Sequence, residues 1–138
     1  MSASFIVDAS VGFAWVYHGQ ATPETDRLLN EVAAGAMVVV PALWYLEMSN
    51  VLLIAQRRHR LTVVQRKAAL EKLTAMQFKV DEEGTRHAFG KTSELSEKHG
   101  LTIYDATYLE LALRRSLPLA TRDEALKVAA KQCGIKAL

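Results

Sequence analysis

Hydrophobic and polar residues follow one another along the chain in blocks whose spacing predicts strands alternating with helices. Short, continuous apolar runs bounded by polar or turn-forming residues are typical of strands that are buried on both faces. Such runs predict strands at residues 5–10, 36–40, 78–80, 117–121 and 135–138. Segments with apolar residues at helical spacing predict helices at residues 10–17, 23–35, 42–57, 63–73, 84–99, 102–115 and 123–133.

Residues with strong preferences for helix ends support several of these boundaries. Thr22 is a good N-cap, and Pro23 fits the first helical position that follows it. Gly35 is a good C-terminal stop for the same helix, and Thr62 caps a later one. Two glycines weaken the helical pattern of residues 84–99, so the boundaries of that helix are the least well defined.

The alternation of strands and helices places the chain in the α/β class. It implies parallel strand pairing, right-handed crossovers and helices on both faces of the sheet. No internal repeat or interdomain linker interrupts the pattern, so residues 1–138 are expected to form a single domain.

Composition excludes several classes of protein. Half of the residues are hydrophobic and 23% are charged, as in a globular protein. No apolar run approaches the roughly 20 residues of a membrane span, and the N-terminus lacks the pattern of a signal peptide. Cys133 is the single cysteine, so no intrachain disulfide can form and a cytoplasmic location is expected. The net charge of +2 says little about partners.

Three aspartates are predicted at one edge of the sheet. Asp8 comes at the end of the first strand, Asp123 follows the strand at 117–121, and Asp105 begins the helix between them. Open α/β folds place their sites at the carboxyl edge of the strands, so these side chains are expected to converge. Each also has a purely structural alternative: Asp8 as an N-cap, and Asp105 and Asp123 as members of capping boxes.

Glu47 is the most informative acid because it interrupts a helix, residues 42–57, that is apolar almost all round. Such a helix is expected to be buried. A buried carboxylate needs a partner or a metal, because desolvation penalises its charged form. Asn50 lies one turn further along the same face. The alternative is a neutral glutamic acid or a buried ion pair.

Together the acids predict a site for a divalent cation. Clustered carboxylates repel one another unless a cation neutralises them. Hard oxygen ligands, without the spacing of histidine or thiolate ligands, favour Mg²⁺ or Mn²⁺ over zinc. No glycine-rich dinucleotide-binding or P-loop motif appears, which argues against those two classes.

Basic and aromatic residues give weaker indications of function. Arginines and lysines that could contact phosphate, or could simply be solvated, are Arg57, Arg58, Arg60, Arg114, Arg115, Arg122, Lys127 and Lys131. Of these, Arg57, Arg58 and Arg122 are predicted to bind substrate. Trp15 and Trp44 are candidate anchors of an apolar partner groove, with core packing as the alternative.

Four short motifs carry the acids: Phe5–Ser10, Glu47–Leu52, Leu101–Ala106 and Ala120–Asp123. Each motif is weak alone. In this order, in a chain of 138 residues, they resemble the signature of PIN domains, most closely the VapC-type toxins of bacterial toxin–antitoxin pairs. The resemblance extends from Phe5 to the C-terminus, and no acid of the family pattern is missing.

The resemblance implies a three-layer α/β/α sandwich with a central, mostly parallel twisted sheet. It also implies a Mg²⁺- or Mn²⁺-dependent endoribonuclease with an RNA substrate, a homodimer, and inhibition by a cognate antitoxin protein. Carried over by position, the acidic metal site consists of Asp8, Glu47, Asp105 and Asp123. The supporting polar residues are Ser10, Asn50 and Thr121.

Two other functions fit part of the pattern. One is a non-catalytic PIN-like module that binds protein or nucleic acid without cutting it, in which capping and buried pairing preserve the acids. The other is a phosphoacceptor receiver domain, which also gathers acids around Mg²⁺ at a sheet edge. The first strand ends in one acid rather than an acidic pair, which argues against the receiver domain.

Overall fold

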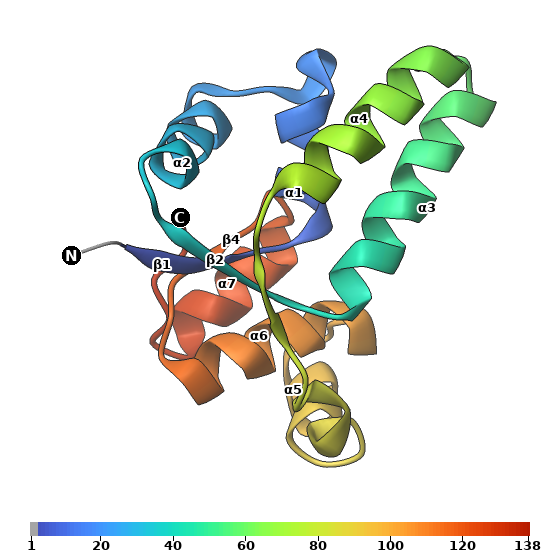
Figure 1. The fold of residues 1–138 in the computed structure, drawn as a ribbon. Helices are drawn as coiled ribbons and strands as arrows, with labels where there is room; N and C mark the ends of the chain where they lie inside the picture. The colour runs from blue at the N-terminus through green and yellow to red at the C-terminus, as the bar shows by residue number, and fades with distance from the viewer. Residues whose placement is uncertain (1–2) are drawn as a thin grey trace.

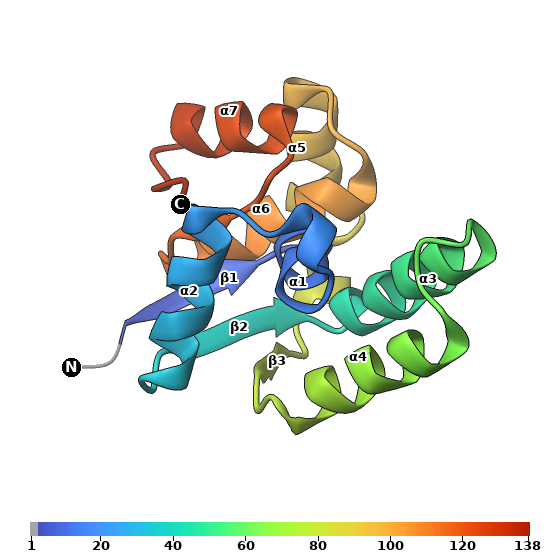
Figure 2. The ribbon, with the colours of Figure 1, turned by 90° about the horizontal axis from the view of Figure 1, so that it is seen from above.

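The chain forms a four-stranded, all-parallel β-sheet with helices on both faces, in a computed structural model that describes residues 3–138. The strand order is β3-β2-β1-β4, and Figure 2 shows β2 lying between β1 and β3. The strands are β1 Ser4–Val7, β2 Met37–Pro41, β3 Lys79–Asp81 and β4 Leu119–Ala120. The predicted α/β class with parallel strand pairing is confirmed.

Helices form the two outer layers of a three-layer α/β/α sandwich. They are α1 Ala9–Val16, α2 Pro23–Ala33, α3 Leu43–Arg57, α4 Val63–Ala75, α5 Lys91–His99, α6 Ile103–Arg115 and α7 Glu124–Gln132. In Figure 1, α1 to α4 lie above the sheet and α5 to α7 below it. Two short 3₁₀ turns, η1 His18–Gln20 and η2 Gly84–His87, connect these elements.

Local capping residues set the helix boundaries where they were predicted. Thr22 forms a capping box with Thr25 at the start of α2, and Thr62 forms one with Gln65 at the start of α4. The predicted helix at 84–99 is divided into η2 and α5, because Gly90 leaves helical backbone conformation at φ −112° and ψ −105°. The predicted last strand at 135–138 is reduced to one bridge, between Leu119 and Ala137.

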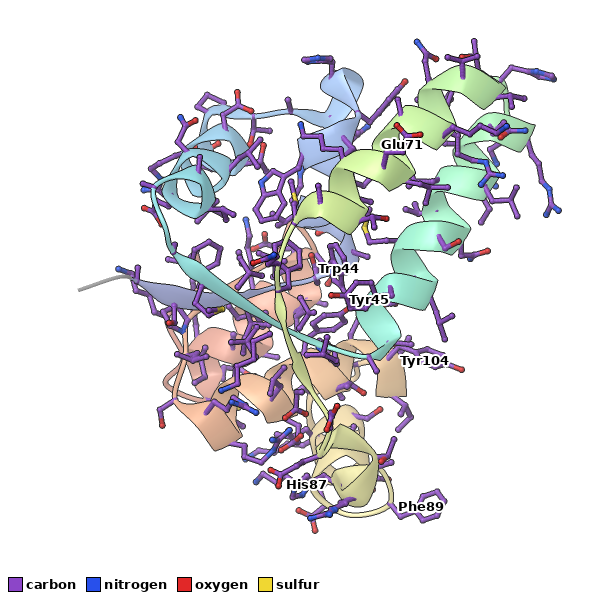
Figure 3. All side chains as sticks on the ribbon, viewed as in Figure 1. Trp44, Tyr45, Glu71, His87, Phe89 and Tyr104 are labelled. Carbon is purple, nitrogen blue, oxygen red and sulfur yellow. The ribbon has the colours of Figure 1, made fainter. Side chains whose placement is uncertain are left out.

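The core lies on both sides of β1, whose residues Phe5, Ile6 and Val7 are inaccessible to solvent or nearly so. Both tryptophans belong to this core. The indole N–H of Trp15 donates to the Thr25 carbonyl at 2.9 Å, and that of Trp44 donates to the Asp8 carbonyl at 3.2 Å. The prediction of groove anchors is therefore wrong, and core packing is the role of both. Figure 3 shows Trp44 inside the molecule, whereas Phe89 extends into solvent.

Helix α3 buries only one side, in contrast to the prediction of a helix buried all round. Trp44, Met48 and Leu52 are buried, but Leu46 is 72% exposed and Tyr45 41% exposed. No other described element covers the face of α3 that carries Tyr45 and Leu46, and the apolar content of the helix could not show this. Within residues 3–138, no helix combines the length and apolarity that crossing a bilayer requires.

A buried ion-pair network stands at the end of β3. The Asp81 side chain is fully buried and receives two 2.8 Å hydrogen bonds from the guanidinium of Arg114, which also binds Glu110. Arg115 adds a third bond to Asp81, at 3.1 Å. These arginines, above all Arg114, hold the pKa of Asp81 down at about 2. Two residues predicted as candidates for phosphate contacts, Arg114 and Arg115, are thus committed to structural pairs.

Candidate active site

Asp8 stands where β1 leaves the sheet, and three donors hold its carboxylate. As the N-cap of α1, it accepts the backbone N–H of Val11 at 3.3 Å. The hydroxyl of Ser10 donates to Oδ1 at 2.5 Å, and the hydroxyl of Thr121 donates to Oδ2. Only 5% of the residue is exposed. The capping role and the predicted place at the sheet edge are therefore combined in one side chain.

Ser10 and Thr121 join the end of β1 to the segment that follows β4. The Ser10 hydroxyl oxygen accepts the backbone N–H of Arg122 at 2.9 Å. The Thr121 hydroxyl oxygen accepts the backbone N–H of Asp123 at 3.0 Å. These two hydroxyls thereby fix the backbone that carries Arg122 and Asp123 against Asp8.

Glu47 is half-buried on α3 and is bound by a tyrosine from α6. The buried hydroxyl of Tyr108 donates to Oε1 of Glu47 at 2.5 Å. Burial, and then this bond to a carboxylate, raise the pKa of Tyr108 well above its usual range. The sequence analysis placed Tyr108 on no site. Tyr108 follows Asp105 by three residues, so the two side chains lie on the same face of the helix. A tyrosine that is buried on that face needs a hydrogen-bond partner for its hydroxyl, and this was the signal available in the sequence.

The two other aspartates begin helices. Asp105 is half-buried in the first turn of α6, and its N–H donates to the hydroxyl oxygen of the capping residue Thr102 at 3.0 Å. Asp123 is exposed and is itself the N-cap of α7, accepting the N–H of Leu126 at 2.9 Å. Asn50 is exposed on α3, one turn beyond Glu47.

The acids act on one another electrostatically. Burial is the largest cause that raises the pKa of Asp8, Glu47 and Asp105. The charges of Asp105 and Asp8 raise the pKa of Glu47 further, against the lowering effect of Tyr108. The charges of Asp123 and Asp8 do the same to Asp105. Four carboxylates from distant parts of the sequence therefore share one electrostatic environment.

The side chains do not form a preassembled cage for a cation. Across residues 3–138, no three histidine, cysteine, aspartate or glutamate side chains stand close enough together to hold an ion. The donors present are carboxylate and hydroxyl oxygens, which suit Mg²⁺ and Mn²⁺. The mutual repulsion of the acids is the penalty that a divalent cation would remove.

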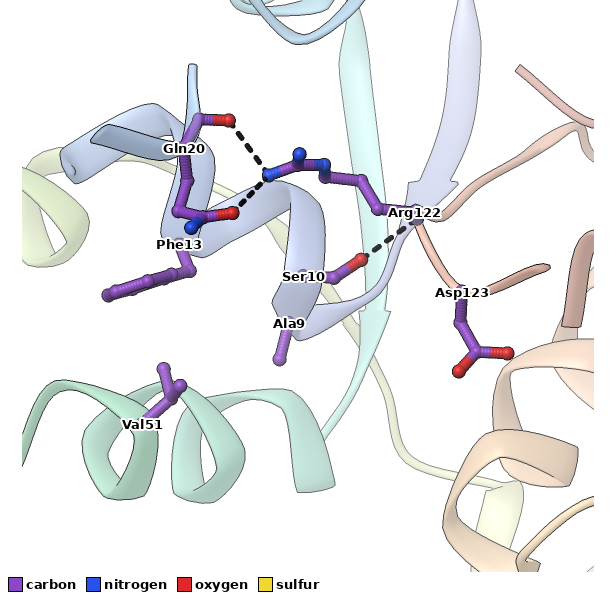
Figure 4. A pocket seen from close by; sticks show the side chains of 7 residues that line it. All are labelled: Ala9, Ser10, Phe13, Gln20, Val51, Arg122 and Asp123. Carbon is purple, nitrogen blue, oxygen red and sulfur yellow. Dashed lines mark hydrogen bonds between the residues drawn. The ribbon is translucent and has the colours of Figure 1, made fainter. Parts of the chain in front are cut away.

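A cavity of about 520 Å³ opens beside Ser10 and Asp123. Its other lining residues include Phe13, Gln20, Val51 and Arg122, as Figure 4 shows. Of the three arginines predicted to bind substrate, only Arg122 lies here. Arg57 and Arg58 are exposed at the far end of α3, ten or more residues beyond Glu47 and thus about 15 Å further along the helix axis.

Comparison with known proteins agrees with this fold. The family model of the PIN domain matches residues 5–132. Among solved structures, PAE2754 from Pyrobaculum aerophilum is 25% identical with a TM-score of 0.71, over 99% of this chain and 92% of that one. VapBC2 from Rickettsia felis, solved with a DNA fragment from its promoter, is 12% identical with a TM-score of 0.66, over 98% and 97%.

A toxin–antitoxin complex from Klebsiella pneumoniae is 18% identical with a TM-score of 0.57, over 86% of each chain. No curated protein sequence matches this chain. The resemblance to PIN domains seen in the four motifs is confirmed by the family match, and these structures share the fold. The chain belongs to the PIN domain family.

Proposed function

We propose that this protein is a Mg²⁺- or Mn²⁺-dependent endoribonuclease that hydrolyses phosphodiester bonds of RNA. The observation that carries the proposal is the hydrogen-bonded arrangement of the acids at the carboxyl edge of the sheet. Thr121 joins Asp8 to the backbone of Asp123, and Tyr108, one helical turn beyond Asp105, binds Glu47. PIN domains are generally nucleases, so the family supports a hydrolase. The cavity beside Asp123, with Arg122 in its wall, gives a phosphodiester strand a place to lie.

Asp8 and Glu47 have distinct parts in this mechanism. A bound divalent cation would neutralise the carboxylates and the phosphoryl oxygens and would lower the pKa of its coordinated water. Asp8 is the most firmly oriented ligand, because three donors fix both of its oxygens. Tyr108 occupies Oε1 of Glu47, which leaves Oε2 to bind the cation or to accept a proton from the attacking water.

The protein is further proposed to be the toxin of a bacterial type II toxin–antitoxin pair, a cytoplasmic homodimer that a cognate antitoxin inhibits. The similarity of its fold to a toxin–antitoxin complex and to VapBC2 supports this assignment. The exposed apolar residues of α3, Tyr45 and Leu46, offer a surface for a protein partner.

A non-catalytic binding module is the second candidate function, favoured by one observation. Asp8 and Asp123 each cap a helix, so their structural role alone is enough to account for both residues. A metal titration separates the two candidates. A nuclease of the proposed kind gains thermal stability from Mn²⁺, whereas a module that only binds a partner gains none.

The test of the proposed function is cleavage of single-stranded RNA with Mg²⁺, with Mn²⁺ and with chelator, beside single-stranded DNA of the same sequence. Glu47→Gln and Asp105→Asn should each lower the rate at least a hundredfold while keeping the parent's circular dichroism. Glu71→Gln, at an exposed position of α4, is the matched control and should cut like the parent. Folded acid-to-amide variants that cleave RNA at the parent's rate would refute the mechanism.

A further inference from the structure

We propose that Arg122, held in place by Gln20, binds a phosphate of the RNA strand next to the one that is cut. This inference rests on the proposed function and adds a subsite to it. The cavity shown in Figure 4 would hold the nucleotide that carries this phosphate.

The guanidinium of Arg122 is fixed, although the residue is exposed. Its Nη1 donates to the backbone carbonyl of Gln20 at 2.8 Å and to the Gln20 side-chain Oε1 at 2.9 Å. Its backbone N–H donates to the hydroxyl of Ser10, which in turn binds Asp8. The backbone of Arg122 is therefore tied to Asp8 through Ser10, and its guanidinium is tied to Gln20.

The rest of the guanidinium is left for a ligand. In the part of the chain that the structure describes, neither Nε nor Nη2 of Arg122 has a hydrogen-bond partner, and no carboxylate pairs with the side chain. The Nε and Nη2 edge is the fork that binds two oxygens of one phosphate. Arg114 shows the contrasting case, since Asp81 and Glu110 already occupy its fork.

Arg122 lines the same cavity as one of the four acids, Asp123. Asp123 and Ser10 line one part of it, and Phe13 and Val51 provide an apolar wall. A volume of about 520 Å³ is in the range of cavities that bind small molecules, so it has room for a nucleotide. A strand whose scissile phosphate lies at the acids would pass directly into this cavity.

Binding of a short fluorescein-labelled single-stranded RNA, measured by anisotropy in chelator, tests the subsite without cleavage. Arg122→Ala should weaken binding about tenfold, as expected for a charge-assisted hydrogen-bonded pair. It should also reduce the slope of log affinity against log salt by about 0.7, the value for one phosphate contact on a single strand. Gln20→Ala keeps the charge and removes only the side-chain contact, so it should weaken binding by a smaller factor.

Arg86→Ala is the matched control, because it removes the same charge from an exposed position on η2 and should leave affinity within twofold of the parent. If Arg122→Ala binds RNA with the parent's affinity and salt slope, the subsite does not exist, even if the variant is less stable. If Arg86→Ala weakens binding equally, Arg122 contributes only general charge and the inference fails. Cleavage by the parent, measured separately, decides the proposed function independently of either result.

Discussion

The hydroxyl of Tyr108 donates a 2.5 Å hydrogen bond to Oε1 of Glu47, although 61 positions separate the two residues in the sequence. Tyr108 lies on α6 and Glu47 on α3, so the bond joins the two helical layers across the edge of the sheet. It fixes the orientation of the one proposed ligand that sits in the middle of a helix. An outer partner of this kind tunes a ligand that it does not replace.

Tyr108→Phe should therefore weaken Mn²⁺ binding by about tenfold or more, since loss of such a partner commonly reduces metal affinity 10- to 100-fold. Isothermal titration calorimetry with Mn²⁺ measures the change directly. Tyr104→Phe, on the same helix but 61% exposed, removes the same atom and should leave the affinity unchanged. Equal Mn²⁺ affinity of Tyr108→Phe and the parent would show that the bond does not orient Glu47 for metal.

The stability of the metal-free protein should rise as the pH falls from neutral toward the ordinary carboxyl pKa of about 4. Burial raises the pKa of Asp8, and burial with mutual repulsion raises the pKa of Glu47 and Asp105. The folded state holds these protons more tightly than the unfolded chain does. Their contribution to stability is complete below the ordinary carboxyl pKa of about 4 and is lost as the pH rises through the raised values.

Asp81 has the opposite dependence, because its pKa is lowered to about 2. Its contribution is present above pH 4 or so and is lost as the pH falls toward about 2, so the melting temperature should pass through a maximum between the two windows. Melting curves in chelator measure this. The double variant Glu47→Gln with Asp105→Asn should show a flatter curve above about pH 4, the ordinary carboxyl pKa. A parent protein that is most stable at neutral pH without metal would contradict the prediction.

Gly12→Ala should destabilise the fold by about 1–3 kcal/mol, the usual effect of overpacking. A Cβ at this position would lie 2.8 Å from Sδ of Met48 and 2.8 Å from Cζ2 of Trp44, both buried on α3. Without that clash, alanine would stabilise helix α1 by about 1 kcal/mol through its higher helix propensity. Urea unfolding measures the sign, and Ala68→Gly at an exposed position of α4 calibrates the propensity difference.

Arg114→Ala should lower the free energy of unfolding by about 3–5 kcal/mol, because it leaves the buried carboxylates of Asp81 and Glu110 without their main partner. Arg86→Ala breaks an exposed pair with Glu83 and should cost less than about 1 kcal/mol. Denaturant unfolding compares the two. Similar losses for both would mean that the network at Asp81 contributes little. Cleavage per folded molecule should be unchanged in either variant, since neither arginine forms a hydrogen bond or ion pair with the four acids of the proposed site.

Local patterns in the sequence were sufficient to predict most of the elements. The apolar run of β1 and the capping residues Thr22 and Thr62 act through neighbours a few positions away, so their effects are visible in the sequence. The same holds for the acids that follow strands, because a parallel sheet brings its carboxyl ends to one edge.

What could not be predicted depends on which surfaces meet. Leu46 is exposed because no other described element covers it, and the sequence of α3 does not reveal this. The pairing of Arg114 with Asp81, and of Arg122 with Gln20, joins residues whose separation carries no signal. Tyr108 is buried on α6, and its partner Glu47 could be named only from the packing of α6 against the rest of the fold.

The hydrogen bond from Thr121 to Asp8 joins positions 113 residues apart. During synthesis Asp8 leaves the ribosome long before Thr121, which follows β4, and Asp123, the N-cap of α7. The proposed site is thus completed only after residue 123 has been translated. A nascent chain that ends before this point carries Asp8 without the hydroxyl and the carboxylate that complete the proposed site.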